Sequence, residues 1–280
     1  MEKHRLAGLF VAVTALVVCQ ESRADKDIPF RIFSDWNAYN DYGWMAIQRG
    51  DYGRAERMFT RAIETARPFA ADDRRLLARS YHDLAWALYE EKRYGEAEPL
   101  AQWALAVREQ QLGEGSKAVG QSLHTLAVIY VAQRKYAEAE PLYEKAISIW
   151  EKTLGPDNLV TAAARFDLAM VFSSQHKYSH AEPLLKRALA SVEKVLGPTH
   201  HDLAQILVPL ADLYVAVGKN DDAEKLYQRS ISILEKPPPG DLTSMSRALE
   251  HYASLLRQMH RDKEAEPYEA RAKAMHARAR

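Results

Sequence analysis

An alanine–glutamate pair recurs along this chain at one fixed interval. Each step is 42 residues, as from Ala55 to Ala97 (97 − 55 = 42) and from Ala97 to Ala139 (139 − 97 = 42), and the register never shifts. A constant period of this length indicates a stack of similar structural units. The alanines of the six pairs are Ala55, Ala97, Ala139, Ala181, Ala223 and Ala265.

Each period contains the pattern of two amphipathic helices. Apolar residues in the segment 123–130 follow the spacing i, i+3, i+4, i+7, which places them on one face of a helix. A second apolar stripe occupies the segment 139–147, after a short polar turn. Because one helical hairpin cannot bury both of its faces alone, the hairpins are expected to stack.

Small residues and helix stops repeat with the same period. A small residue lies twelve positions before each alanine of the pairs, where paired helices are expected to cross with their axes about 8–10 Å apart. A Leu-Gly or Leu-Gly-Pro sequence follows the second helix and predicts its end. Pro141 is expected in the first helical turn, where a missing amide hydrogen is tolerated. The small residues are Gly43, Ala85, Ala127, Ala169, Ala211 and Ala253, and the stop glycines are Gly113, Gly155 and Gly197.

This order of residues resembles the tetratricopeptide repeat, and the 42-residue period with its Leu-Gly-Pro linkers resembles the kinesin-light-chain-like subtype. The resemblance covers residues 35–280. It implies an all-α, right-handed superhelical solenoid of about six antiparallel helical hairpins, at 35–76, 77–118, 119–160, 161–202, 203–244 and 245–280. The basic end of the last unit, residues 270–280, is expected to belong to a capping helix.

The N-terminal segment predicts export. A basic start, an apolar run at residues 6–18 and the small residues Ser22 and Ala24 are typical of a signal peptide over residues 1–24, followed by a short linker over 25–34. An uncleaved anchor and a lipoprotein acylated at Cys19 are alternatives, although Val18 is bulky for a lipoprotein signal. The sequence therefore predicts an exported, periplasmic protein, which contacts a membrane only through an uncleaved or lipidated N-terminus.

Charge and motif content argue against several classes of function. Lys and Arg together number 38, as do Asp and Glu, so no net charge attracts nucleic acid. The sequence has no glycine-rich phosphate loop, no HExxH and no GxSxG motif. We therefore expect no catalytic residues, no metal site and no cofactor, and we expect a protein or peptide as the partner.

Two alternatives to a binding module remain at this stage. His176 and His180 have the i, i+4 spacing of zinc ligands, so a zinc-dependent hydrolase that also uses His200 is one of them. In the repeat register, however, His176 and His180 fall in the turn between two helices, and His200 falls at a helix entry. The other alternative is a structural homo-oligomer whose end units stack between chains.

Binding specificity is expected on the first helix of each hairpin. Positions −3, +1 and +4, counted from the small residue, form one stripe along the helix. Because a helix turns by about 100° per residue, this stripe lies roughly 120° around the helix from the core stripe. In the family that the sequence resembles, this stripe lines the concave groove that holds a partner's peptide or helix. Trp44 and Trp86 occupy equivalent positions in two hairpins, and the sequence leaves open whether they face the groove or the core. The predicted groove residues, chiefly in the first four units, are Asn40, Asp41, Trp44, His82, Trp86, Tyr89, His124, Val128, Phe166 and Met170.

Overall fold

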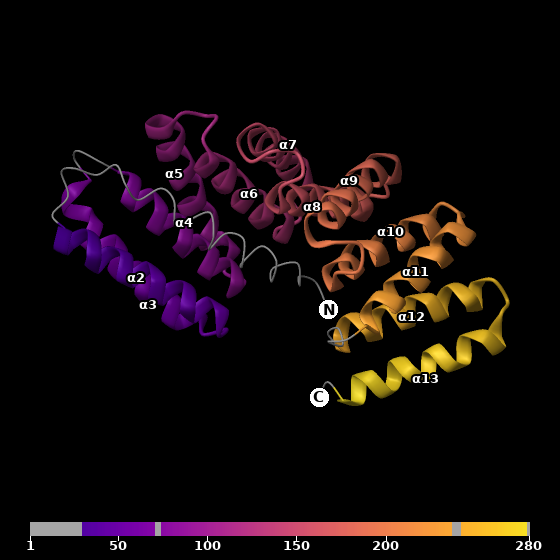
Figure 1. Ribbon diagram of the computed structural model, residues 1–280. Helices are drawn as coiled ribbons and strands as arrows, with labels where there is room; N and C mark the ends of the chain where they lie inside the picture. The colour runs from indigo at the N-terminus through magenta and orange to yellow at the C-terminus, as the bar shows by residue number, and fades with distance from the viewer. Residues whose placement is uncertain (1–29, 71–73, 237–241, 279–280) are drawn as a thin grey trace. The chain divides into compact units, whose positions relative to one another are not determined.

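The computed structural model describes residues 30–70, 74–236 and 242–278, and over these residues the regular secondary structure is all helix. The expected signal peptide and the Pro-rich linker at 237–240 lie outside the described residues. Twelve α-helices pair as six antiparallel hairpins, so the prediction of an all-α stack of hairpins is confirmed (Figure 1). The first helix already begins at Phe30, inside the segment that the sequence predicts as a linker.

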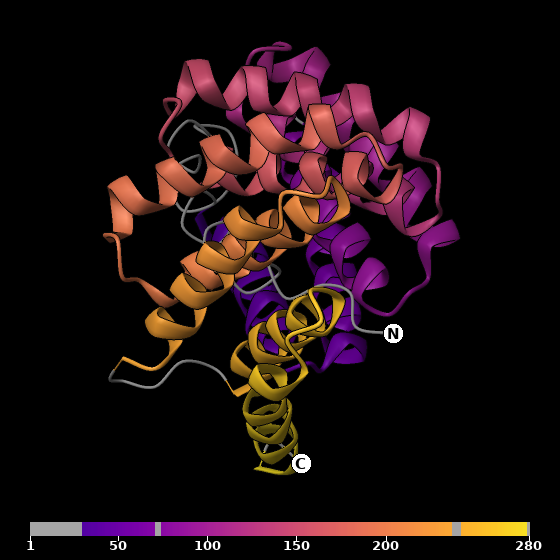
Figure 2. The same ribbon diagram turned by 90° about the vertical axis from the view of Figure 1, so that its right-hand side faces the viewer.

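The hairpins follow one another along the chain, and Figure 2 shows the same pairing from a second direction. They are α2 (Phe30–Gln48) with α3 (Tyr52–Ala66), α4 (Arg75–Glu90) with α5 (Tyr94–Leu112), α6 (Lys117–Ala132) with α7 (Tyr136–Thr153), α8 (Leu159–Ser174) with α9 (Tyr178–Leu196), α10 (Ala204–Ala216) with α11 (Asn220–Leu234), and α12 (Leu242–Gln258) with α13 (Asp262–Arg278). Two single turns of 3₁₀ helix, Arg67–Phe69 and His201–Leu203, precede α4 and α10.

The chain divides into two compact units, Met1–Gly155 and Pro156–Arg280. Unit 1 contains the described hairpins α2–α3, α4–α5 and α6–α7, and unit 2 contains the other three. Within unit 1, α2 contacts α4 and α4 contacts α6, whereas second helices of neighbouring hairpins make no contact of similar extent in the described chain. The first helices therefore converge on one side of the unit, which we call the inner side.

Small residues occupy the crossings that the sequence predicts for them. Every alanine of the alanine–glutamate pairs is buried, and so are Ala85, Ala127 and their equivalents. A Cβ atom added to Gly43 would lie 2.4 Å from the ring of Phe59 on the paired helix, which is closer than carbon atoms can pack. The prediction that these positions set the helix separation is confirmed.

The turn inside each hairpin contains one residue with positive φ, and these residues are again 42 apart. Only two of the six are glycines, although a left-handed backbone is unfavourable for other residues. His176 is among them, with φ of 59°, so it precedes α9 and does not share a helical face with His180. The six residues are Gly50, Lys92, Arg134, His176, Gly218 and His260.

Glycine ends the second helices as expected, but with a different backbone conformation. α5 ends at Leu112 and α9 at Leu196, each directly before its glycine. Gly113 has φ 80° and ψ 149°, and Gly197 has φ 92° and ψ 160°, so neither adopts the left-handed helical conformation that is common after a helix end. This extended region at positive φ is open essentially only to glycine, which explains why glycine recurs at this position.

The repeated proline lies one turn later than the sequence suggests. Helix α7 begins at Tyr136, so Pro141 is its sixth residue and lies inside the helix. The prediction that Pro141 lies in the first helical turn is wrong, because α7 already begins at Tyr136, directly after the short turn. The proline therefore removes one helical hydrogen bond near the helix start, where the freed carbonyl group lies close to solvent.

The glutamate of the alanine–glutamate pair connects neighbouring hairpins. It forms an ion pair with the basic residue that precedes the second helix of the next hairpin. The oxygen–nitrogen distances are 2.8 Å for Glu56–Arg93, 2.8 Å for Glu98–Lys135, 3.4 Å for Glu182–Lys219 and 2.7 Å for Glu224–Arg261. Exposed pairs of this kind contribute little stability each, so their regular spacing mainly fixes the register between hairpins.

Candidate functional site

The predicted groove residues of unit 1 lie on α2, α4 and α6, and most of them are buried. Val128 is half-buried and Asp41 is exposed. Trp86 is only 4 % exposed, and its ring lies 5.2 Å from that of Tyr89. The buried members are Asn40, Trp44, His82, Trp86, Tyr89 and His124.

In unit 2 the predicted groove residues lie on α8. Phe166 is buried, whereas Met170 has 38 % of its surface exposed. Val128 and Met170 occupy the equivalent position one residue after the small residue of their hairpins. They are the predicted groove residues whose apolar side chains keep some exposed surface in each unit.

Asn40 holds α2 and α4 together. The Trp36 indole N–H donates to Ser80 Oγ at 2.8 Å, and Ser80 Oγ donates in turn to Asn40 Oδ1 at 3.4 Å. The Asn40 amide also donates to the Trp36 carbonyl at 2.8 Å. Because all three side chains are buried, this network fixes the spacing of the first two hairpins.

Asp83 is a fully buried carboxylate that sequence reasoning did not select. Arg79 Nε lies 3.9 Å from Asp83 Oδ2, which is the distance of an ion pair and too long for a hydrogen bond. Burial raises the pKa of the Asp83 carboxyl to about 6, against the opposing effects of Arg79, Arg108 and the Trp44 indole. Burial also lowers the pKa of the neighbouring His82 well below its usual value, and Arg108 and Arg79 lower it further.

Arg108 links the second and third hairpins of unit 1, and His124 packs inside the third. The His124 ring lies 5.3 Å from the Tyr143 ring and 5.6 Å from the Trp150 ring, so it packs against α7. The buried Arg108 donates to the Ala118 carbonyl at 3.1 Å and to Ser122 Oγ at 2.9 Å. These contacts place a guanidinium group next to the inner side of α4 and α6.

Three buried polar atoms near the inner side form no hydrogen bond in the described part of the chain. They are His82 Nδ1, Gln121 Nε2 and Thr125 Oγ1. A buried donor or acceptor that lacks a partner lowers stability by about 1–3 kcal/mol. Such groups are rare in native proteins, so three of them on two adjacent helices call for an explanation.

Unit 2 carries a second polar cluster on α10, α11 and α12. Asp212 Oδ1 accepts a hydrogen bond from Tyr227 Oη at 2.5 Å and lies 2.6 Å from His251 Nδ1. The hydrogen bond to Asp212 raises the pKa of His251, and burial together with Asp212 raises that of Tyr227. The sequence signal for this cluster is Asp212 itself, because the equivalent position is Trp, Val or Met in the earlier hairpins.

The histidines of the zinc alternative do not form a metal site in the described residues, where no group of three His, Cys, Asp or Glu side chains could hold an ion. His176 Nδ1 lies 2.8 Å from Tyr178 Oη, and the His180 ring packs on Phe172 at 5.3 Å. His200 Nδ1 accepts from the Asp202 backbone N–H at 3.3 Å, which confirms its predicted role at a helix entry.

The raised pKa of Asp83 predicts how the stability of unit 1 depends on pH. The pKa of Asp83 is about 6 in the folded chain and near 4 in the unfolded chain. Between these two pH values the folded chain binds a proton that the unfolded chain does not, so Asp83 makes the protein more stable as pH falls. Urea unfolding of D83N and of the parent, followed by tryptophan fluorescence, should show this effect. The difference in unfolding free energy, variant minus parent, should fall by about 1 kcal/mol from pH 7 to pH 5.

All five tryptophans lie in unit 1, so the fluorescence signal reports this unit alone. The titration of His82 acts in the opposite direction, because its lowered pKa removes stability as pH falls. That contribution is present in both proteins and cancels in the difference. A difference that is the same at both pH values would contradict the raised pKa of Asp83.

Comparisons with known proteins agree with this architecture. A family model described as tetratricopeptide repeat matches residues 37–110, 119–194 and 180–236, which together cover more than half of the chain. A comparison with curated protein sequences found no match. Among the described helices, none has the length and apolar character that a membrane span requires.

Similar solved structures include kinesin-light-chain-like proteins. The structure of BtubC (BKLC) from P. vanneervenii superposes with a TM-score of 0.71 at 23 % identity, covering 81 % of this chain and 92 % of the other. A putative kinesin light chain repeat protein from Podosopora anserina gives 0.66 at 24 % identity, with 74 % and 98 % covered. Pseudomonas aeruginosa pilF gives 0.63 at 18 % identity, with 87 % and 93 % covered. At these identities the likeness establishes the fold alone.

Proposed function

Because the chain belongs to the tetratricopeptide repeat family, whose members are generally non-catalytic interaction modules, we propose that it binds a segment of a partner protein along the inner side of its first helices. The observation that carries the proposal is the set of buried polar atoms on α4 and α6 that form no hydrogen bond in the described chain. An extended peptide brings main-chain N–H and C=O groups, which are the partners that such atoms need.

The route that we propose for a partner segment runs between α4 and α6. These two helices contact each other far less than either contacts its own hairpin partner. The proposal requires that a small separation of α4 from α6 exposes His82, Gln121 and Thr125 while the hairpins stay intact. The half-buried Val128 lies on the same helix as Thr125 and gives a partner's apolar side chain its first contact.

Variation between hairpins also supports this side as the specific surface. The small residues and the alanine–glutamate pairs repeat in every hairpin, since each hairpin needs the same packing. The inner positions instead change from Trp44 and Trp86 to Val128 and Met170. Packing alone would favour the same residue type at each equivalent position, whereas recognition of one partner sequence requires different ones.

We also propose that binding takes place in the bacterial periplasm. The support is the sequence of the N-terminal segment, with its apolar run at residues 6–18 and the small residues Ser22 and Ala24. The partner is accordingly sought in the envelope fraction. A photo-reactive amino acid at Val128 or Met170 should form cross-links to one partner segment there, whereas the same probe at the exposed Val195 of α9 should not.

Replacing Thr125 by valine tests the proposal on the molecule itself. Thr125→Val removes a buried hydroxyl that has no partner while keeping the shape of the side chain, so stability should rise by about 1 kcal/mol. Affinity for the cross-linked partner peptide should fall about ten-fold, because a hydrogen bond of the complex is lost. Urea unfolding and titration calorimetry measure the two effects.

The matched control is Thr60→Val on α3. The Thr60 hydroxyl donates to the Glu56 carbonyl at 2.8 Å and is exposed, so its removal should neither raise stability nor change affinity. If Thr125→Val raises stability and leaves affinity unchanged, the inner side is a packing surface and the proposal fails.

A further inference from the structure

The outer face of α2 carries an apolar stripe with a charge at each end. Asp35, Ala38, Tyr42, Met45 and Arg49 follow one another at intervals of three and four residues, so they lie on one face of the helix and of the turn after it. Tyr42 is 51 % exposed and Met45 is 45 % exposed. These are among the largest apolar exposures in the described chain.

The positions of Met45 and Asp35 are buried in the other hairpins, and within unit 1 the first helices α4 and α6 pack on the second helix of the hairpin before them. The equivalents of Met45 are Ala87, Ile129, Val171, Leu213 and Leu255, all of them buried. The equivalents of Asp35 are Leu77, Val119, Thr161, Leu203 and Met245, also buried. The stripe on α2 therefore has the geometry of a hairpin-docking face, but two of its members are charged.

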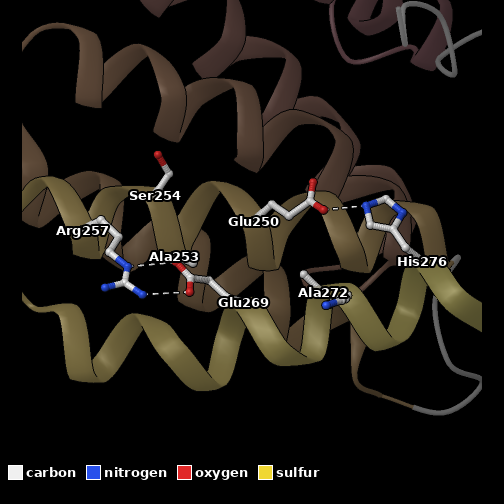
Figure 3. A pocket seen from close by; sticks show the side chains of 8 residues that line it. Glu250, Ala253, Ser254, Arg257, Glu269, Ala272 and His276 are labelled. Carbon is white, nitrogen blue, oxygen red and sulfur yellow. Dashed lines mark hydrogen bonds and ion pairs between the residues drawn. The ribbon is translucent and has the colours of Figure 1, made fainter.

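The last hairpin does not present a matching surface. At the positions where α7 carries Tyr143, Ile147 and Trp150, α13 carries Glu269, Lys273 and His276. Glu269 Oε1 accepts from Arg257 Nε at 2.9 Å, and His276 Nε2 lies 2.5 Å from Glu250 Oε1, so the hollow between α12 and α13 is lined by ion pairs (Figure 3). This polar face does not complement an apolar stripe.

The charges at the two ends of the α2 stripe are complementary when two copies of the stripe pair antiparallel. Asp35 lies seven residues before Tyr42, and Arg49 lies seven residues after it. In an antiparallel pair of α2 helices centred on Tyr42, Asp35 of each copy therefore comes opposite Arg49 of the other. Both side chains are exposed, and neither forms an ion pair in the described part of the chain.

We propose that two copies of this chain associate through the outer stripe of α2, antiparallel about a two-fold axis at Tyr42. The contact buries Tyr42 and Met45 of both copies and forms two symmetric Asp35–Arg49 ion pairs. A net charge of zero means that no long-range repulsion opposes the association. This inference is independent of the inner side, because Tyr42 and Met45 belong to a different face of α2.

Sedimentation equilibrium over a concentration series tests the association. The parent mass should rise toward twice the monomer mass, whereas Tyr42→Glu and Met45→Glu should remain monomeric over the same range, because each places two charges in the centre of the contact. Val195→Glu on α9 is the matched control, since Val195 is 50 % exposed, and it should associate like the parent. A constant monomer mass for the parent would overturn the proposal and indicate a different protein as the occupant of the stripe.

Charge reversal tests the antiparallel register. Asp35→Arg and Arg49→Asp alone should each associate about ten-fold more weakly than the parent, because two like-charge pairs replace two ion pairs. An equimolar mixture of the two variants should regain the parent affinity as a heterodimer, in which both pairs are again opposite in sign. If the mixture stays as weak as its components, the register is wrong, and circular dichroism of each variant confirms that the helices are intact.

Discussion

Replacing Trp150 by alanine should lower the unfolding free energy of unit 1 by about 3–5 kcal/mol, the range for truncation of a large buried aromatic side chain. Trp150 is only 2 % exposed, and its indole N–H donates to the Lys117 carbonyl at 3.3 Å. Its ring also packs against the His124 ring. Urea unfolding followed by the four remaining tryptophans measures the loss, because they too lie in unit 1.

The effect of Gly120→Ala on the unfolding free energy should change sign when Trp150 is replaced by alanine. In the parent, a Cβ atom at Gly120 would lie 2.7 Å from Trp150 Nε1, so the substitution should destabilise by about 1–3 kcal/mol. In the Trp150→Ala background that clash is absent, and alanine should stabilise α6 by up to about 1 kcal/mol through its helix propensity. Equal effects in both backgrounds would mean that Gly120 does not act through Trp150.

The repeating features were predictable because each hairpin needs them for the same reason. The period and the buried alanines follow from contacts that are identical in all hairpins, so the sequence shows the alanine six times and the helix-stop glycine three times. The ion pairs of Glu56 and its equivalents escaped prediction, since they join residues about one period apart. Spacing alone does not reveal how far one hairpin is turned against the next.

The inner residues were located correctly on the first helices, but their burial was not predictable. Turning by about 100° per residue gives the direction of a side chain and says nothing of how closely the next helix approaches. Asn40 is buried because Trp36 and Ser80, which are 44 residues apart, meet at the α2–α4 contact. Asp83 was missed for the same reason, since a single Asp in an amphipathic helix is usually exposed.

Trp86 provides the sharpest test of that burial. Because it is 4 % exposed on α4, Trp86→Ala should lower the unfolding free energy of unit 1 by about 3–5 kcal/mol, whatever its role toward a partner. Trp103→Ala on α5 is the matched control. Trp103 is half-buried, and its ring lies 4.7 Å from the Tyr81 ring at the edge of the core, so a smaller loss is expected.

The comparison of these two variants decides how Trp86 can serve binding. A larger loss for Trp86→Ala than for Trp103→Ala makes Trp86 part of the packing that positions Tyr89 and His82 on the inner side. Partner affinity then falls only because α4 is disturbed, and it recovers with Trp86→Phe, which restores most of the buried volume. Equal losses for the two variants would instead show that the Trp86 ring contributes no more to packing than the half-buried Trp103 ring, which would contradict its place in the core.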